Sequence, residues 1–120
     1  MAYMLLIMEE RGQRKERGLE KGRVVYDRML RFGAELAGRG LLKGADALHP
    51  DSQGVRVAVR AGKSTVVDGP FAEAKEMVGG FFLLDCKTKE EAVAIARACP
   101  AAEWATVEVR EIGTCYDGLE

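Results

Sequence analysis

Histidine and cysteine are scarce in this sequence, and their spacing does not suit a metal site. His49 is the single histidine, and the three cysteines, Cys86, Cys99 and Cys115, contain no C-x-x-C pair. An odd set of this kind argues against both a disulfide framework and a zinc site. One imidazole and scattered carboxylates also argue against a tight transition-metal site. We therefore expect no metal and no cofactor, and we expect reduced thiols in a cytoplasmic protein.

An excess of charge and a long apolar run are absent as well. Lysine and arginine number 18 against 19 acidic residues, so the net charge is -1. General nucleic-acid binding rests on neutralising phosphates, and this balance argues against direct contact with nucleic acid. The longest apolar run, Met1–Met8, precedes Glu9 and Glu10. A membrane span needs roughly 20 residues and a signal peptide has a basic start. The run is instead typical of a buried strand, and no membrane partner is expected.

The length and composition predict one domain over residues 1–120. The chain has 120 residues, of which 48% are apolar, and domains commonly contain about 100–150 residues. The sequence shows no internal repeat or low-complexity tract. The tail from about residue 113 is expected to be loose.

Hydrophobic periodicity predicts two helices and several short strands. One helix is expected over 24–38 and the other after Thr88, which with Glu91 fits a capping box. The charged and glycine-containing stretch 9–23 is expected to be a solvated loop with a short helical piece. Strands are expected at 2–9, 41–49, 55–60, 64–67, 80–85 and 105–112. The turn Ala61-Gly62-Lys63 is expected to join the third and fourth strands into a hairpin. Trp104 is expected to start the last strand.

This order of elements predicts an α+β fold, a ferredoxin-like βαββαβ arrangement with an extra β-hairpin. Two helices can cover one face of such a sheet. Strands 2–9 and 80–85 are nevertheless apolar at both odd and even positions, so both faces are expected to be buried. We therefore expect a homodimer in which the uncovered faces of two sheets pack together.

The stretch from Asp68 to Gly80 is the candidate functional segment. Gly69 can adopt positive φ and Pro70 fixes the next φ, so the two would orient Asp68 and Phe71. A purely structural reading also fits, because Asp-Gly-Pro is a common turn and Phe71 could anchor it in the core. The residue types favour that reading about two to one over a ligand site.

His49 is the residue whose ordinary pKa, about 6.5, suits proton transfer at neutral pH. It lies in a predicted turn with Ser52 close by and Arg56 further along. A lone histidine in a loop is more often an ordinary surface residue, so the residue type alone leaves its role open.

Several segments resemble one family. The stretch from Val67 to Phe81, VDGPFAEAKEMVGGF, is similar to the signature of the DGPF proteins, a branch of the YCII-related superfamily. Leu48-His49-Pro50 with Ser52 and Arg56-Val57 resembles one branch, in which serine is more usual where Asp51 stands. Similarity extends from about residue 2 to 112, through Tyr3–Ile7, Glu90-Glu91-Ala92, Cys99-Pro100 and Val107–Arg110.

The resemblance implies a dimeric α+β barrel and leaves two functions open. In the first, the protein is a small-molecule enzyme in which Asp68 orients His49 for proton transfer. The expected ligand-binding residues are then Ser52, Arg56, Phe71, Lys75 and Glu76. In the second, it is a non-catalytic ligand-sensing or protein-binding module linked to sigma-factor-dependent transcription. A sigma factor or another protein would be its partner, because DGPF domains occur joined to sigma factors.

Overall fold

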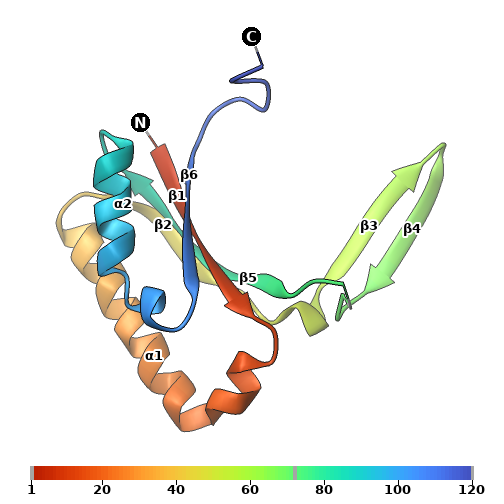
Figure 1. Ribbon diagram of the computed structural model, residues 1–120, viewed down its shortest axis with the longest axis horizontal. Coiled ribbons are helices and arrows are strands. Elements are labelled where there is room, and N and C mark those ends of the chain that lie inside the picture. The colour runs from red at the N-terminus through yellow and green to blue at the C-terminus, as the bar shows by residue number, and fades with distance from the viewer. Residues whose placement is uncertain (1, 72, 120) are drawn as a thin grey trace.

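Four antiparallel strands form the main sheet of the computed structural model, which describes residues 2–71 and 73–119. Their order across the sheet is β2-β5-β1-β6, which is the ferredoxin-like order of an α+β fold. Helices α1 (Gln13–Gly38) and α2 (Lys89–Ala98) lie on one side of the sheet (Figure 1). The strands span β1 (Ala2–Glu10), β2 (Leu42–Ala47), β5 (Glu76–Asp85) and β6 (Thr106–Glu111). The predicted fold class and element order are confirmed.

The core lies between the helices and one face of the sheet. On β1 every second side chain, including Tyr3, Leu5 and Ile7, is buried on this face. Phe32 of α1 meets Phe82 of β5 edge to face, with ring centroids 5.2 Å apart. Burying such side chains supplies most of the favourable free energy of folding.

The opposite face of the sheet, here called the open face, is half-buried and apolar. It carries Met4, Leu6 and Met8 from β1, which alternate with the core positions, and Phe81 and Leu83 from β5. Within one chain this face is only half-buried, and its burial against a second copy stays a prediction. Both helices lie on the other side, so this face keeps partial contact with solvent.

Helix α1 begins at Gln13, so the predicted loop over 9–23 is wrong for most of its length. Gly18 interrupts it with φ 81° and ψ 173°, a conformation that favours glycine. Contacts outside the helix stabilise its first turns. The Gln13 side-chain amide donates to the Trp104 carbonyl oxygen at 2.6 Å, and Arg14 pairs with Glu9. Tertiary contacts thus stabilise helical structure before Gly18, although the helix is broken at Gly18 itself.

Strand β5 begins at Glu76, four residues before its predicted start, so the second half of the signature is strand. Ile7 pairs with Gly80 and Met8 with Val78, which leaves Gly79 as the extra residue of a β-bulge. The predicted cap of α2 by Thr88 is confirmed, because the Glu91 amide donates to Thr88 Oγ1 at 3.1 Å, while the Glu91 carboxylate accepts from the Lys87 amide at 3.2 Å in place of the Thr88 amide. Trp104 precedes the last strand, which starts at Thr106.

Strands β3 (Val55–Arg60) and β4 (Lys63–Asp68) form the predicted hairpin, and it projects away from the main sheet on the side opposite the helices (Figure 1). Val57 and Val66 are cross-strand partners on one face, and both are more than 60% exposed. Residues 112–119, which follow β6, are also exposed. Among the described residues, no helix has the length and apolar character needed to cross a membrane.

Candidate functional site

The loop after β2 forms the first wall of the site. Leu48 continues the pairing with β5 because its amide donates to the Gly79 carbonyl oxygen at 2.8 Å. The chain then turns through Pro50 and the short 3-10 helix η1 (Asp51–Gln53). The Gly54 amide closes this turn by donating to the Asp51 carbonyl oxygen at 2.9 Å. The turn predicted around His49 is therefore present, and it holds the histidine at the end of the sheet.

The signature packs directly against that loop through Gly69. A β-carbon at residue 69 would lie 1.8 Å from the Asp51 carbonyl oxygen, so only glycine fits there. The Gly69 amide donates to the Gly54 carbonyl oxygen at 2.8 Å. The Gly69–Pro70 peptide bond is cis. Gly69 does not have positive φ, so its predicted role is corrected: close backbone approach, rather than a left-handed turn, requires glycine here.

Arg11 joins the two walls. Its Nη1 atom donates to the carbonyl oxygens of Phe71 at 2.9 Å and Ala74 at 3.2 Å. Its Nε atom lies 3.1 Å from Asp51 Oδ2, an ion pair that lacks the alignment of a hydrogen bond. Arg11 thereby neutralises the carboxylate of the loop while holding the signature. Sequence reasoning missed Arg11, since it placed this residue in a solvated charged segment.

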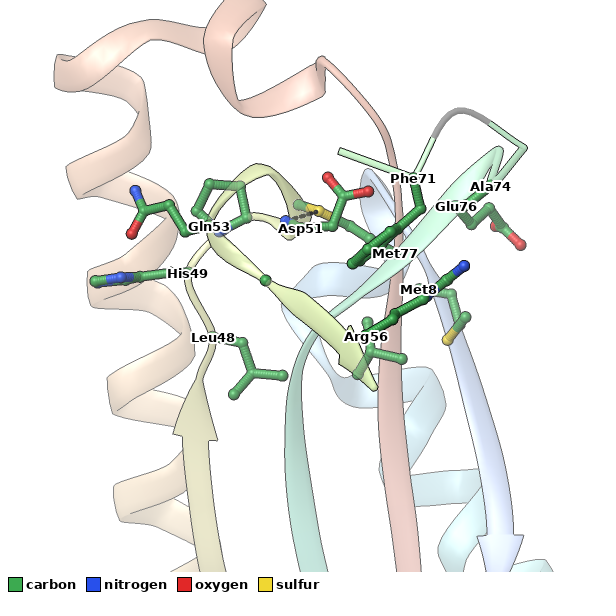
Figure 2. A pocket seen from close by; sticks show the side chains of 13 residues that line it. Met8, Leu48, His49, Asp51, Gln53, Arg56, Phe71, Ala74, Glu76 and Met77 are labelled. Carbon is green, nitrogen blue, oxygen red and sulfur yellow. Dashed lines mark hydrogen bonds between the residues drawn. The ribbon is translucent and has the colours of Figure 1, made fainter. Parts of the chain in front are cut away.

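The walls enclose a cavity of about 440 Å³, here called the hairpin-base cavity. Its floor is apolar, with Met8, Leu48, Phe71, Met77 and Val78, and its polar groups come from His49, Asp51, Gln53, Arg56 and Glu76. Figure 2 shows Arg56 beside Phe71, and the guanidinium carbon lies 3.9 Å from the ring centroid. In the same view His49 and Gln53 point away from that stack. The Asp51 amide contacts Met77 Sδ at 3.4 Å.

The structure brings four of the predicted site residues to this cavity. His49, Arg56, Phe71 and Glu76 line it, whereas Ser52, Lys75 and Asp68 are exposed residues outside its lining. Asp68 ends β4 as the cross-strand partner of Val55. Within residues 2–71 and 73–119, no hydrogen bond joins His49 to Asp68. Asp51 is the aspartate that shares the cavity with His49, and the pairing of His49 with Asp68 stays a prediction.

A buried ion pair supports the floor of the site from the helix side. Glu9 is only 4% exposed, and Arg14 binds it through two hydrogen bonds, Nε to Oε1 at 3.0 Å and Nη2 to Oε2 at 2.6 Å. Arg14 also donates to the carbonyl oxygens of Leu48 at 2.7 Å and Gly79 at 3.1 Å. A β-carbon on Gly79 would overlap Glu9, so the bulged glycine makes room for this pair. Arg14 thus fixes the backbone immediately before His49.

The described part of the chain holds no cluster of three or more histidine, cysteine, aspartate or glutamate residues that could bind a metal ion. The lining of the hairpin-base cavity supplies one imidazole, one stacked guanidinium and two carboxylates. These groups can transfer a proton and hold an anion.

Comparison with known sequences identifies the family. The sequence model of the YCII-related domain matches residues 1–114. The chain belongs to the YCII-related family. This YCII-related chain is also 39% identical over 73 residues to an uncharacterised protein, R00369, of Rhizobium meliloti strain 1021. That match covers 59% of each protein.

A solved structure shares the fold of this YCII-related chain. It is the 5-chloro-2-hydroxyhydroquinone dehydrochlorinase TftG from Burkholderia phenoliruptrix AC1100, in complex with 2,5-dihydroxybenzoquinone. The TM-score is 0.54, the sequence identity is 14%, and the alignment covers 94% of both chains. The likeness establishes the ferredoxin-like α+β fold, and the dimer implied by the resemblance in the sequence stays a prediction.

Proposed function

We propose that this YCII-related chain is an enzyme that binds a small planar anion or acidic hydroxyl compound in the hairpin-base cavity. The observation that carries the proposal is the Arg56–Phe71 stack over an apolar floor whose lining includes His49, and the imidazole, which points away from the stack in Figure 2, has to turn toward a ligand held there. Small-molecule sites typically combine such a floor with a few polar groups. That a protein of the same fold binds 2,5-dihydroxybenzoquinone supports a flat, hydroxylated ligand.

His49 is the proposed general base. In its neutral form the imidazole accepts a proton from the substrate, and the proton passes to solvent when the product leaves. Arg56 forms none of the ion pairs among the described residues, so its guanidinium edge is available to hold the resulting anion. Phe71 supports both the guanidinium plane and a flat ligand. Asp51 is neutralised by Arg11. It therefore positions the loop and does not compete with the substrate anion for Arg56.

The test begins with binding. Hydroxylated quinones, aromatic acids and organic phosphates are titrated into the purified protein, and a bound ligand raises the melting temperature. Arg56→Gln should abolish most of the shift, whereas Arg60→Gln, on the same hairpin but outside the cavity, should not. His49→Gln should keep binding but lose turnover of any compound that the protein converts. Full turnover by His49→Gln would contradict the proposed base.

We also propose that Asp68 acts only if ligand binding moves it toward His49. Asp68→Asn separates the two versions of the site. A loss of turnover as deep as that of His49→Gln would support the predicted pair, while unchanged turnover would leave His49 working without Asp68.

A homodimer is the proposed assembly. The open face is apolar over β1 and β5, and an exposed face of this kind marks an interaction site. Met8 and Val78 belong both to this side of the sheet and to the cavity lining, so a second copy packed there would also cover the cavity. Sedimentation equilibrium should give twice the chain mass, and Leu6→Asp should give the monomer. A monomeric wild-type protein at micromolar concentration would contradict the assembly.

The alternative function is a non-catalytic module linked to sigma-factor-dependent transcription, and one observation favours it. The hairpin projects with the exposed valines 55, 57, 59 and 66, which suits a protein partner better than solvent. A partner-binding role would be lost in Val57→Lys and kept in His49→Gln, which is the reverse of the pattern expected for the enzyme. We place either function in the cytoplasm.

A further inference from the structure

A second and larger cavity lies on the helix side of the main sheet. Its volume is about 950 Å³, and it runs between α1 and the strands β1, β2 and β5. Ile7 and Phe82, which line it, alternate with the open-face residues of their strands. The hairpin-base cavity includes Met8 and Val78 from the other face. The two cavities are therefore on opposite faces of the sheet, and the second, here called the helix-side cavity, plays no part in the proposed reaction.

Small residues on both walls account for this space. Gly33, Ala34 and Ala37 of α1 line the cavity, and Ala45 and Ala47 of β2 line it from the sheet. Ala34, Ala37 and Ala47 are themselves exposed, so the space is open to solvent along α1. Short side chains on both walls leave a gap where longer ones would have closed it. The gap is large enough for a small organic molecule.

Most of the remaining lining is apolar and partly aromatic. Met29 and Leu30 of α1 and Trp104 lie around the cavity together with Ile7 and Phe82. Met29 and Trp104 also pack against the main core. A flat or branched hydrocarbon body would bury apolar surface here on binding, which is favourable in proportion to the area removed from water.

One part of the lining is basic. Lys15, Arg17 and Arg23 line the cavity from the first turns of α1, and none of them takes part in an ion pair within residues 2–71 and 73–119. Arg17 lies over Trp104, with its guanidinium carbon 5.6 Å from the ring centroid.

The lining carboxylates do not cancel this charge. They are Glu9, which Arg14 already neutralises, and Asp46. The lining thus offers apolar walls with an excess of cationic groups at the α1 side. An amphipathic anion complements both features.

We propose that the helix-side cavity is a second binding site, and that its ligand is a hydrophobic organic acid. The hydrocarbon body lies between α1 and the sheet against Ile7, Phe82 and Met29. The carboxylate lies toward Lys15 and Arg23, at the solvent-facing edge of the cavity. This site is separate from the His49 site, and its ligand is bound without reaction.

The first experiment compares two probes that differ only in charge. A naphthalene carboxylate and the corresponding uncharged amide are titrated into the full chain by calorimetry. The single tryptophan, Trp104, reports contact through the NMR signal of its indole N–H. We expect the carboxylate to bind and shift that signal, and the amide to bind about twofold to fivefold more weakly, as one or two exposed ion pairs would predict. Equal affinity for the two probes would overturn the assignment of an acid.

Matched variants locate the site. Ala47→Phe places a ring in the cavity and should abolish binding, whereas Ala94→Phe adds the same ring at an exposed position of α2 outside either cavity lining. Ala34→Leu blocks the cavity from the helix wall and serves if Ala47→Phe fails to fold. Arg23→Gln should weaken the carboxylate about twofold to fivefold, and Arg97→Gln, on α2, should not.

Two outcomes would overturn the proposal. Binding that survives both blocking variants but is lost in Phe71→Ala would place the acid in the hairpin-base cavity. Sedimentation without ligand compares the molecular mass of Ala47→Phe with that of the wild type. A difference would mean that a second copy of the chain occupies the helix-side cavity. A constant mass together with loss of binding supports the site.

Discussion

Gly69 and Asp51 meet backbone to backbone, at a distance that leaves no room for a side chain on residue 69. A β-carbon there would lie 1.8 Å from the Asp51 carbonyl oxygen. The contact joins the start of the family signature to the loop that carries His49. Gly69 therefore acts by close approach, and Phe71, two residues later, lines the hairpin-base cavity.

Gly69→Ala is predicted to destabilise the protein and to open the hairpin-base cavity. The added methyl group must push the two segments apart, and such overpacking costs about 2–3 kcal/mol of unfolding free energy. Urea denaturation measures this loss. Gly44→Ala is the control, since its β-carbon would meet nothing within 4 Å. The account fails if the two variants are equally stable.

Glu9→Gln is predicted to destabilise the protein by removing the partner of Arg14. The Glu9 side chain is 6% exposed and that of Arg14 is 33% exposed. Breaking a fully buried pair costs about 3–5 kcal/mol, and we expect about 2–3 kcal/mol here because Arg14 keeps some water. Denaturant unfolding should show the difference, while Glu35→Gln, in an exposed pair with Arg39 on α1, should change stability by less than about 0.5 kcal/mol. Similar values for both variants would contradict the role assigned to the pair.

The fold was predictable because its signals are local. Alternating valines mark β3, Thr88 with Glu91 marks the start of α2, and double-sided apolar runs mark the two central strands. The first turns of α1 were not predictable in this way. Gln13 and Arg14 are held by Trp104 and Glu9, contacts that no periodicity in the sequence reveals.

The candidate site was predictable only in part for the same reason. The family signature and the single histidine pointed to Phe71, Arg56 and His49, which do line one cavity. Arg11 was missed because its partners are backbone carbonyl oxygens of a segment 60 or more residues away. Every residue has a backbone carbonyl oxygen. The residue types of the bound segment therefore do not indicate that an arginine binds there, and a single sequence cannot reveal the contact.

The three cysteines are predicted to differ in reactivity. Cys86 and Cys99 are buried, and burial raises the pKa of both thiols, whereas Cys115 is exposed. A thiol reagent at pH 8 should therefore label Cys115 within minutes and the other two only after unfolding. Because the folded pKa values are raised, the thiols favour the folded state below the ordinary thiol pKa, and this contribution declines as the pH rises above it. Mass spectrometry of the labelled protein distinguishes one modified cysteine from three, and rapid labelling of Cys99 in the folded protein would contradict its burial.

Gly18→Ala is predicted to destabilise α1 although nothing surrounds the site. A β-carbon at residue 18 would meet no atom within 4 Å, so the effect comes from the backbone alone. With φ 81° and ψ 173°, the residue occupies a region that side chains avoid, and forcing alanine into it costs about 1–3 kcal/mol. Gly22→Ala, four residues later within the same helix, is the matched control and should stabilise the protein by about 0.5–1 kcal/mol through helix propensity. A lower unfolding free energy for Gly18→Ala together with a higher one for Gly22→Ala would support the interruption at Gly18. If both substitutions stabilise the protein, the helix runs through Gly18 without a break. The residues before Gly18 would then have another orientation, and Lys15 and Arg17 would not line the helix-side cavity.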